Sequence, residues 1–170
     1  MVITSPDNAK VIEVTKLLDK KYRKKSGRYI IEGARLVADA FKYGADIVSV
    51  FVSESLQNNF NYDNQIVVCD KVFAKMSDTV TSQGVLAVVN KQQGRITSFS
   101  GNSLILDGLQ DPGNVGTLLR TAVACNFTNI YAVNCVDIYS PKVLRSAMSA
   151  HFCLNLYEST NLQQVFERLD

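Results

Sequence analysis

The sequence has few of the residues from which metal sites and disulfide frameworks are built. Its 170 residues include one histidine, His151, and four cysteines that are far apart and form no C-x-x-C pair. This set does not supply the ligands of a zinc site, so we expect no bound metal. Three of the cysteines lie within or beside apolar segments, and we expect buried free thiols rather than disulfides. The cysteines are Cys69, Cys125, Cys135 and Cys153.

The chain also lacks long apolar runs. No run approaches the ~18 residues of a membrane-spanning helix, and the first residues do not form a basic and apolar leader. With 46% hydrophobic and 20% charged residues, the chain can form one ample core or two small ones. These properties predict a globular cytoplasmic protein.

The net charge of +2 conceals an uneven distribution. Residues 1–28 hold eight cationic and three acidic side chains, a net charge of +5, so the other 142 residues sum to −3. Residues 8–25 are predicted to form one helix with Val11, Val14, Leu18 and Tyr22 as its apolar line. Clustered cations at a helix end suit a phosphate backbone, although a solvated helix end has the same composition. The candidate nucleic-acid contacts are Lys21, Arg23, Lys24, Lys25 and Arg28.

Short β-type and helical segments alternate along the chain, which predicts an α/β fold. Residues 91–102 contain two glycines and no acidic residue, so we expect a connector at 92–102 between domains at 1–91 and 103–170. The first domain is predicted to have strands at 29–32, 47–52, 65–69 and 85–90 and helices at 33–43 and 70–78. The second is predicted to have parallel strands at 104–106, 129–133 and 152–157, with later helices at 142–150 and 161–169.

The most informative segment is Leu104 to Ala122, LILDGLQDPGNVGTLLRTA. A β-type run ends at Asp107, a loop containing glycine follows, and a helix is predicted to begin with Asn114 as its cap. Apolar residues then recur at helical spacing and leave Arg120 pointing away from the sheet among small neighbours. Open α/β sheets bind ligands in the loops after their strands, so we expect the working site here. The spacing alone is equally compatible with an Arg120 that has no function beyond keeping an exposed helix face in contact with solvent.

Two known phosphate-binding loops do not match this segment. Gly108 and Gly113 have the spacing of a P-loop, but Asn114 and Val115 stand where that loop needs lysine and a hydroxyl residue. The glycines of the segment also do not fit the dinucleotide pattern G-x-G-x-x-G. Nucleotide hydrolysis is therefore poorly supported. A small-molecule or nucleotide-binding α/β protein is a hypothesis that we consider weaker than those developed below.

The segment resembles the first motif of the SpoU (TrmH-like) RNA ribose methyltransferases of the SPOUT class. In that family a strand ending in Asp leads through D-P-x-N-x-G to a helix with R-T-A. The matching residues are Asp111, Pro112, Asn114, Gly116, Arg120, Thr121 and Ala122. The resemblance implies transfer of a methyl group from S-adenosylmethionine to a ribose 2′-hydroxyl, with Arg120 as the main catalytic residue and Asn114 organising the RNA backbone. Because arginine is almost always protonated, we favour a role in orientation and electrostatics over proton abstraction.

Two further regions are similar to parts of that family. Residues 31–33 (IEG), Val37 and residues 82–87 (SQGVLA) resemble the N-terminal substrate-binding domain often fused to these enzymes, in which we expect Glu32 and Gln83 to support loops. Residues 141–150 resemble an RNA-facing helix of pattern P-K-x-x-R-x-S-x-G-A, which implies RNA contacts by Lys142 and Arg145. Ser140 is expected to cap this helix. Ala147 and Ser149 depart from the pattern, which has serine and glycine at those positions; alternatively this is an ordinary surface helix.

The resemblance implies a small N-terminal α/β RNA-binding domain followed by a partial parallel-sheet α/β methyltransferase domain that lacks its C-terminal knot. Two later family motifs, which form the knot and the cofactor pocket, are not found in these 170 residues. We therefore expect a truncated chain that is inactive alone and does not bind S-adenosylmethionine; a natural short, non-catalytic RNA-binding protein is the alternative. The expected partner is structured RNA, in particular rRNA, and the full-length family implies a homodimer, although the assembly of this chain is left open.

Overall fold

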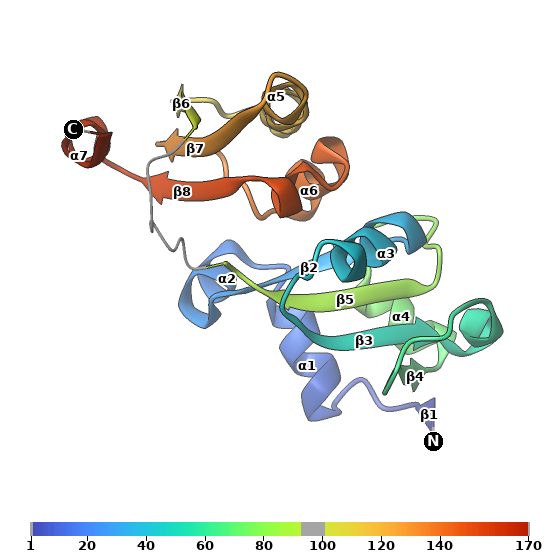
Figure 1. Cartoon of the computed structure of the whole chain (residues 1–170). Helices are drawn as coiled ribbons and strands as arrows, with labels where there is room; N and C mark the ends of the chain where they lie inside the picture. Colours follow the sequence, from blue (N-terminus) through green and yellow to red (C-terminus); the bar gives the residue numbers. More distant parts are fainter. Residues whose placement is uncertain (1, 93–100, 170) are drawn as a thin grey trace. The chain divides into compact units, whose positions relative to one another are not determined.

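The computed structural model describes residues 2–92 and 101–169 and divides into two units, residues 1–91 and 92–170 (Figure 1). Most of the expected connector, residues 93–100, lies outside the described residues. The first strand of the second unit begins at Asn102, two residues before the strand expected from residue 104. Each unit has its own sheet.

The first unit is a five-stranded sheet in the order β1-β4-β3-β5-β2. β1, β4 and β3 are parallel, and β5 is antiparallel to both β3 and β2. The four strands expected from the sequence are confirmed, and β1 is an additional edge strand. Their bounds are β1 (Val2–Ile3), β2 (Arg28–Glu32), β3 (Ile47–Ser53), β4 (Ile66–Val68) and β5 (Val85–Asn90).

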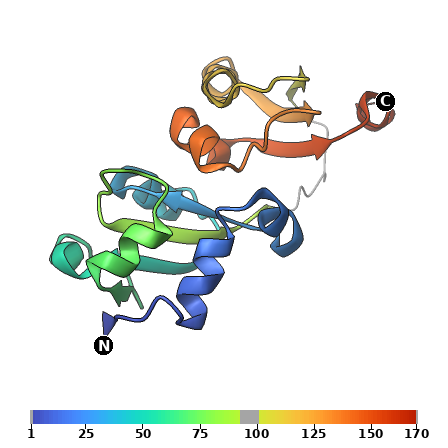
Figure 2. The same ribbon diagram turned by 180° about the vertical axis from the view of Figure 1, so that it is seen from behind.

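Helices cover both faces of this sheet. α1 (Ala9–Lys16) and α4 (Asp70–Met76) pack on one face, seen in front in Figure 2, where Val14 and Phe73 meet Phe51 of β3 in a buried cluster. α3 (Ala34–Lys42) lies against β2 and β5 on the other face. A 3-10 helix, η1 (Glu54–Asn59), follows β3.

The expected single helix over residues 8–25 is wrong, because the chain breaks between α1 and α2 (Lys20–Ser26). Asp19 has an extended backbone, and its carboxylate accepts hydrogen bonds from the Lys21 and Tyr22 amides, which makes it the N-terminal cap of a second helix. Leu17 rather than Leu18 is fully buried at the break. The spacing of apolar residues does not reveal such a break, because the apolar residues predicted for one long helix are shared between the two shorter helices.

The second unit is a three-stranded sheet in the order β6-β7-β8, and its strands are parallel, as the sequence predicts. Its crossover helices α5 and α6 pack on each other. Right-handed crossovers place both on the same face of the sheet, whereas Val165 of α7 joins Tyr131 and Val133 of β7 in a separate buried cluster. The bounds are β6 (Asn102–Asp107), α5 (Pro112–Ala124), β7 (Phe127–Val133), α6 (Pro141–Ala147), β8 (Asn155–Ser159) and α7 (Leu162–Leu169).

The chain between α6 and β8 differs from the prediction. The helix ends at Ala147 rather than residue 150, a 3-10 helix η2 (Ala150–Cys153) follows, and β8 begins at Asn155 instead of residue 152. The cause is the backbone of Met148 and Ser149, which have φ angles of 45° and 73°. This left-handed region favours glycine, the residue that the family pattern has at position 149.

No helix among residues 2–92 and 101–169 is long and apolar enough to cross a membrane, and no group of three or more potential metal ligands occurs in these ranges. All four cysteines are free, as expected. The expectation that they are buried is wrong, because Cys125 and Cys153 are exposed where α5 and η2 end, and Cys69 and Cys135 are half-buried.

His151 is predicted to make the second unit sensitive to acid. Its buried ring donates from Nε2 to the Ile138 carbonyl at 2.7 Å, and burial lowers the pKa of His151 to about 4. Protonation therefore favours the unfolded chain: the contribution to stability is full above about pH 6.5 and is lost as the pH falls towards 4. We expect the free energy of unfolding at pH 5 to be about 2 kcal/mol lower than at pH 7.5. Urea unfolding at both pH values tests this; in His151→Leu the difference should shrink, and an equal difference in that variant would contradict the assignment.

Candidate functional site

The candidate site lies at the carboxyl edge of the second unit's sheet, where the loops after β6 and β7 meet. Gly108, with φ at 69°, donates its amide to the Val133 carbonyl, and the Val136 amide donates to the Leu109 carbonyl at 2.8 Å. Gln110 then donates from Nε2 to the Asn134 carbonyl at 2.6 Å. These bonds hold the loop in one conformation as it enters α5, so the first turn of that helix has a defined position relative to the strands.

Asp111, not Asn114, caps α5. Its Oδ1 accepts from the Asn114 amide at 2.7 Å, and Pro112 occupies the first helical turn, where a missing N–H costs nothing. The predicted cap at Asn114 is wrong because the helix starts two residues before it. Asn114 lies instead in the first turn of α5, and its side chain is exposed.

Arg120 is exposed on the outward face of α5, as the spacing predicts. Val115, Leu119 and Ala122 are buried on the opposite face. Beside Arg120, the hydroxyls of Thr117 and Thr121 bond back to carbonyls of their own helix. No ion pair of Arg120 occurs among the described residues, so its guanidinium is available to a ligand.

α5 and α6 approach each other closely at Gly116. A Cβ at this position would lie 2.4 Å from Ser146 Cβ and 2.8 Å from the Ala147 amide nitrogen. Ser146 also donates its hydroxyl to the Gly113 carbonyl in the first turn of α5, at 3.1 Å. This crossing fixes α6, and with it the exposed Lys142 and the half-buried Arg145, beside the helix that holds Arg120. Sequence reasoning missed Ser146, because a lone serine gives no signal of a bond between helices.

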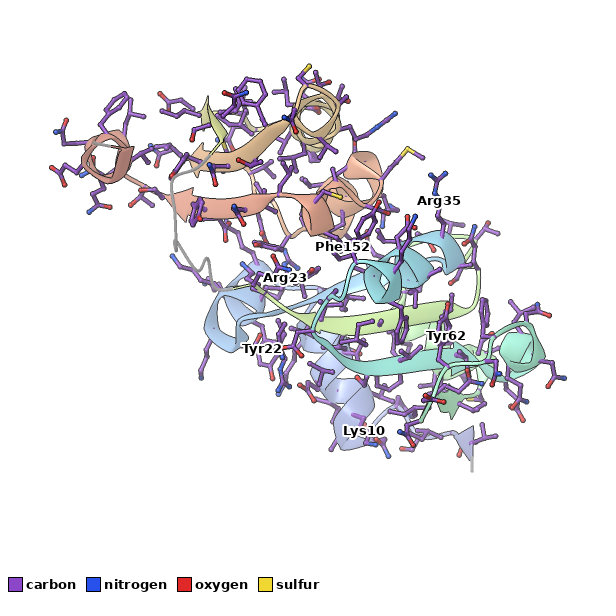
Figure 3. The ribbon with its side chains drawn as sticks, viewed as in Figure 1. Lys10, Tyr22, Arg23, Arg35, Tyr62 and Phe152 are labelled. Carbon is purple, nitrogen blue, oxygen red and sulfur yellow. The ribbon has the colours of Figure 1, made fainter. Side chains whose placement is uncertain are left out.

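The basic cluster of the first unit is only partly exposed. Lys21, Lys24 and Lys25 on α2 are exposed. Arg23 is 4% exposed and donates from Nη1 to the carbonyls of Leu17 and Leu18, both at 2.7 Å (Figure 3). Its guanidinium satisfies the carbonyls at the end of α1, so the structure argues against the predicted RNA contact at Arg23.

Arg28 is also engaged within the first unit. It forms an ion pair with Glu13 and donates from Nε to Asn90 Oδ1 at 3.2 Å. The pair is more than a third exposed at both residues, so a phosphate could still exchange for Glu13. The exposed lysines are nevertheless the better candidates for nucleic-acid contact.

Glu32, the last residue of β2, anchors the loop between α4 and β5. Its Oε1 accepts from the hydroxyls of Ser77, Thr79 and Ser82, at 2.6–2.7 Å, and its Oε2 from the Asp78 amide. Gln83 accepts from the Ala34 amide at the start of α3. Both residues have the loop-supporting role expected of them, and they give the turn between β2 and α3 a fixed shape.

Comparison with known proteins agrees with this geometry. Residues 101–170 match the SpoU rRNA Methylase family, and residues 8–87 match the MRM3-like substrate binding domain. The chain belongs to the SpoU rRNA methylase family. The family expected from the motif at residues 104–122 is therefore confirmed, and so is the α/β fold class.

Members of the SpoU family from several organisms are similar to this chain. It is 33% identical to rRNA methyltransferase 3A, mitochondrial, of Danio rerio, over 88% of this chain and 38% of that protein. It is 30% identical to the 23S rRNA (guanosine(2553)-2′-O)-methyltransferase RlmP of Bacillus subtilis (strain 168), over 88% and 62%. The chain thus spans about two fifths of the length of the mitochondrial relatives.

Solved structures of the same family share the fold. The crystal structure of an RNA 2′-O ribose methyltransferase superposes with a TM-score of 0.78 at 27% identity, over 99% of this chain and 69% of that one. The AdoMet-bound rRNA methyltransferase of Sinorhizobium meliloti superposes with a TM-score of 0.82 at 23% identity, over 98% and 67%. S-adenosylmethionine is accordingly the cofactor at the level of the family. A homodimer and a cytoplasmic location stay predictions.

For this SpoU family member, the exposed lysines of α2 predict a salt-dependent RNA interaction. Reversing Lys21, Lys24 and Lys25 to glutamate should weaken binding to all RNA sequences, because phosphate contacts carry little sequence information. The slope of log affinity against log salt should become shallower by about two to three units. Filter binding at several salt concentrations measures both.

A matched control reverses the same number of charges elsewhere in the first unit, at Lys10 on α1 and Lys71 and Lys75 on α4, all exposed. The control should retain affinity and slope. Equal losses in both triple variants would show a general charge effect and contradict a binding site on α2.

Proposed function

We propose that this chain is the RNA-binding and Arg120-bearing part of an S-adenosylmethionine-dependent RNA 2′-O-ribose methyltransferase that acts on structured rRNA. The observation that carries the proposal is Arg120, exposed on a helix that Asp111 caps at the carboxyl edge of a parallel sheet. Relatives that are similar to most of this chain are named as rRNA methyltransferases, and one as a 2′-O-methyltransferase. The names of the relatives support the methylation of rRNA as the reaction, and the exposed position of Arg120 supports its part in that reaction.

The role proposed for Arg120 follows from the chemistry of its side chain. A ribose hydroxyl is a poor nucleophile until its proton leaves, and a guanidinium is too weak a base to remove that proton. Its planar fork can instead hold a phosphate of the RNA backbone in two hydrogen bonds. The ribose attached to that phosphate is then held in place, and the positive charge stabilises the negative charge that develops on the 2′-oxygen.

Asn114 is proposed to assist from the first turn of α5. Its amide can both donate to and accept from the RNA backbone, and its main chain is fixed by the bond to Asp111. Lys142 and Arg145 on α6 are proposed to bind neighbouring phosphates, since the crossing at Gly116 keeps α6 beside α5. RNA would thus be held by two helices whose relative position is set by close packing.

S-adenosylmethionine supplies the methyl group in this family, and a cofactor of that size needs an enclosed pocket with polar groups directed into it. Several polar groups at the edge of this sheet are engaged in hydrogen bonds within the protein. Gln110 bonds the Asn134 carbonyl, the Cys135 thiol donates to the Leu106 and Val133 carbonyls, and the Asp137 carboxylate accepts from the Tyr139 amide. Within the described ranges these residues do not by themselves fit the cofactor, so we propose that further parts of a longer polypeptide complete its site.

Two measurements on the 170-residue chain test the proposal. Filter binding should detect an interaction with rRNA fragments, and equilibrium dialysis should detect no retention of labelled S-adenosylmethionine. Tight binding of the cofactor would contradict our account of the pocket. Absence of RNA binding at low salt would contradict the proposed function itself. RNA binding without methyl transfer by any longer form of the protein would favour a non-catalytic RNA-binding protein.

A further inference from the structure

A cluster of aromatic side chains lies outside the regions discussed above, on the first unit. Phe41, near the end of α3, stacks on Tyr62 with ring centroids 4.9 Å apart and ring planes within 9° of parallel (Tyr62 is labelled in Figure 3). Phe60 lies at 6.3 Å from Tyr62, with planes within 16°. We call Phe41, Phe60 and Tyr62 the aromatic platform. Its rings are close to parallel, as in a stack of bases.

Phe41 is the solvent-exposed member of the platform, at 47% exposure, whereas Phe60 and Tyr62 are half-buried. Tyr43, which follows α3, is 45% exposed. Large aromatic side chains are usually buried, and adjacent exposed ones are a common sign of a binding surface. Phe41 lies one helical turn after the buried Val37, at the edge of the buried stripe of α3, and is nevertheless almost half exposed.

The segment that supplies Phe60 and Tyr62 is rich in amide side chains. Residues 58–65 read NNFNYDNQ, and all four asparagines are exposed. An amide side chain both donates and accepts hydrogen bonds, which suits the edges of nucleobases. Proteins that bind unpaired RNA bases stack them on aromatic side chains and hydrogen-bond to their edges.

A cation accompanies the rings. Lys42 is exposed, and its Nζ lies 5.5 Å from the centre of the Tyr43 ring. Arg35 on the same helix extends from the surface (Figure 3), with Asp39 3.8 Å away. Two acidic residues, Asp39 on α3 and Asp63 next to Tyr62, lie close in sequence to the platform residues. The surface around the platform therefore has charges of both signs and does not attract phosphate strongly. Stacking rather than charge distinguishes this surface from α2.

We propose that an unpaired base of an RNA substrate stacks on Phe41 of the aromatic platform, with the amides of residues 58–65 at the edge of that base. The inference rests on the proposed RNA-binding function and adds a preference for single-stranded nucleotides in loops or bulges. A paired duplex does not expose a base face, whereas bases in loops can turn outward and stack on aromatic side chains. The platform would then contribute to the choice of substrate, and the lysines of α2 to affinity for any RNA.

The chain contains no tryptophan, which makes a direct test available. Phe41→Trp places the chain's single tryptophan at the platform and preserves the aromatic surface, and its indole can be excited selectively over the seven tyrosines. Titration with an RNA hairpin that has an unpaired loop should quench this fluorescence, and a fully paired duplex of equal length should quench it much less. Equal quenching by both RNAs would overturn the proposal.

Affinity measurements with Phe41→Leu complete the test. Leucine maintains an apolar side chain over the unit but cannot stack, so binding to the hairpin should weaken roughly tenfold while binding to the duplex is unchanged. The matched control is Phe166→Leu on α7, because Phe166 is equally exposed at 47%. The control should bind both RNAs as the unaltered chain does.

The remaining outcomes also decide the matter. Hairpin binding that is unchanged in Phe41→Leu, or equal losses for hairpin and duplex, would overturn the platform while RNA binding by α2 stands. Absence of binding to either RNA by the unaltered chain would overturn the proposed function and the platform together. Self-association that Phe41→Leu abolishes, with RNA affinity retained, would identify the surface as a protein interface and would also overturn the proposal.

Discussion

Replacing Arg120 by alanine is expected to reduce methyl transfer by roughly 10²–10³-fold, because the variant loses a preorganised positive group at the reacting ribose. RNA affinity should change little, since the exposed lysines of α2 and the cations of α6 remain. Stability should also be unchanged, because Arg120 is exposed and has no ion pair among the described residues. The measurement is the initial rate of methyl incorporation into rRNA under single-turnover conditions, by the longer polypeptide that we propose above.

Arg120→Lys is the control that separates charge from geometry. Lysine retains the positive charge but loses the planar fork, so we expect an intermediate rate if bidentate phosphate binding is the role of Arg120. A variant with lysine that is as fast as the unaltered enzyme would show that charge alone suffices. Full activity in Arg120→Ala would contradict a catalytic role for this residue.

Gly116→Ala is expected to destabilise the second unit by roughly 2 kcal/mol. The added Cβ would lie 2.4 Å from Ser146 Cβ and 2.8 Å from a backbone nitrogen, so α5 and α6 must move apart, which costs about 3 kcal/mol for overpacking. The better helix propensity of alanine offsets about 1 kcal/mol of this cost. Urea unfolding followed by circular dichroism measures the difference.

Gly113→Ala in the same helix is the matched control for Gly116→Ala. Its Cβ would meet only the Asp111 carboxylate oxygen, at 3.1 Å, which can adjust by a small rotation. We expect this variant to remain within about 1 kcal/mol of the unaltered chain, since helix propensity favours alanine. Equal stability of both variants would show that the helices do not pack as closely as described.

The parts of the molecule that follow from the sequence are those where local chemistry and fold agree. The run from Leu104 to Asp107 forms a parallel strand, and Pro141 begins α6 after the Ser140 cap, as predicted. The buried stripe of α5 leaves Arg120 outside. Each of these features depends on residues adjacent in sequence or one helical turn apart, so the spacing of residue types is enough to predict it.

Features that depend on contacts of one helix or strand with residues outside it could not be predicted in the same way. Arg23 is buried because α1 ends at a point where the Arg23 guanidinium can reach the carbonyls of Leu17 and Leu18. The bond from Ser146 to Gly113 and the stacking of Phe41 on Tyr62 join residues of different elements. The start of α5 was misplaced for a local reason, since Asp111 and Asn114 are both good caps and only the backbone decides between them.

The central claim is that Arg120 holds a ribose-phosphate for methylation of the 2′-oxygen, and the position of the methyl group tests it most directly. Nucleosides from rRNA treated with the intact enzyme and S-adenosylmethionine can be separated and identified by mass spectrometry. The account predicts a 2′-O-methylated nucleoside that is absent when Arg120→Ala replaces the unaltered enzyme. A methyl group on a base, with no 2′-O-methylated nucleoside, would contradict it.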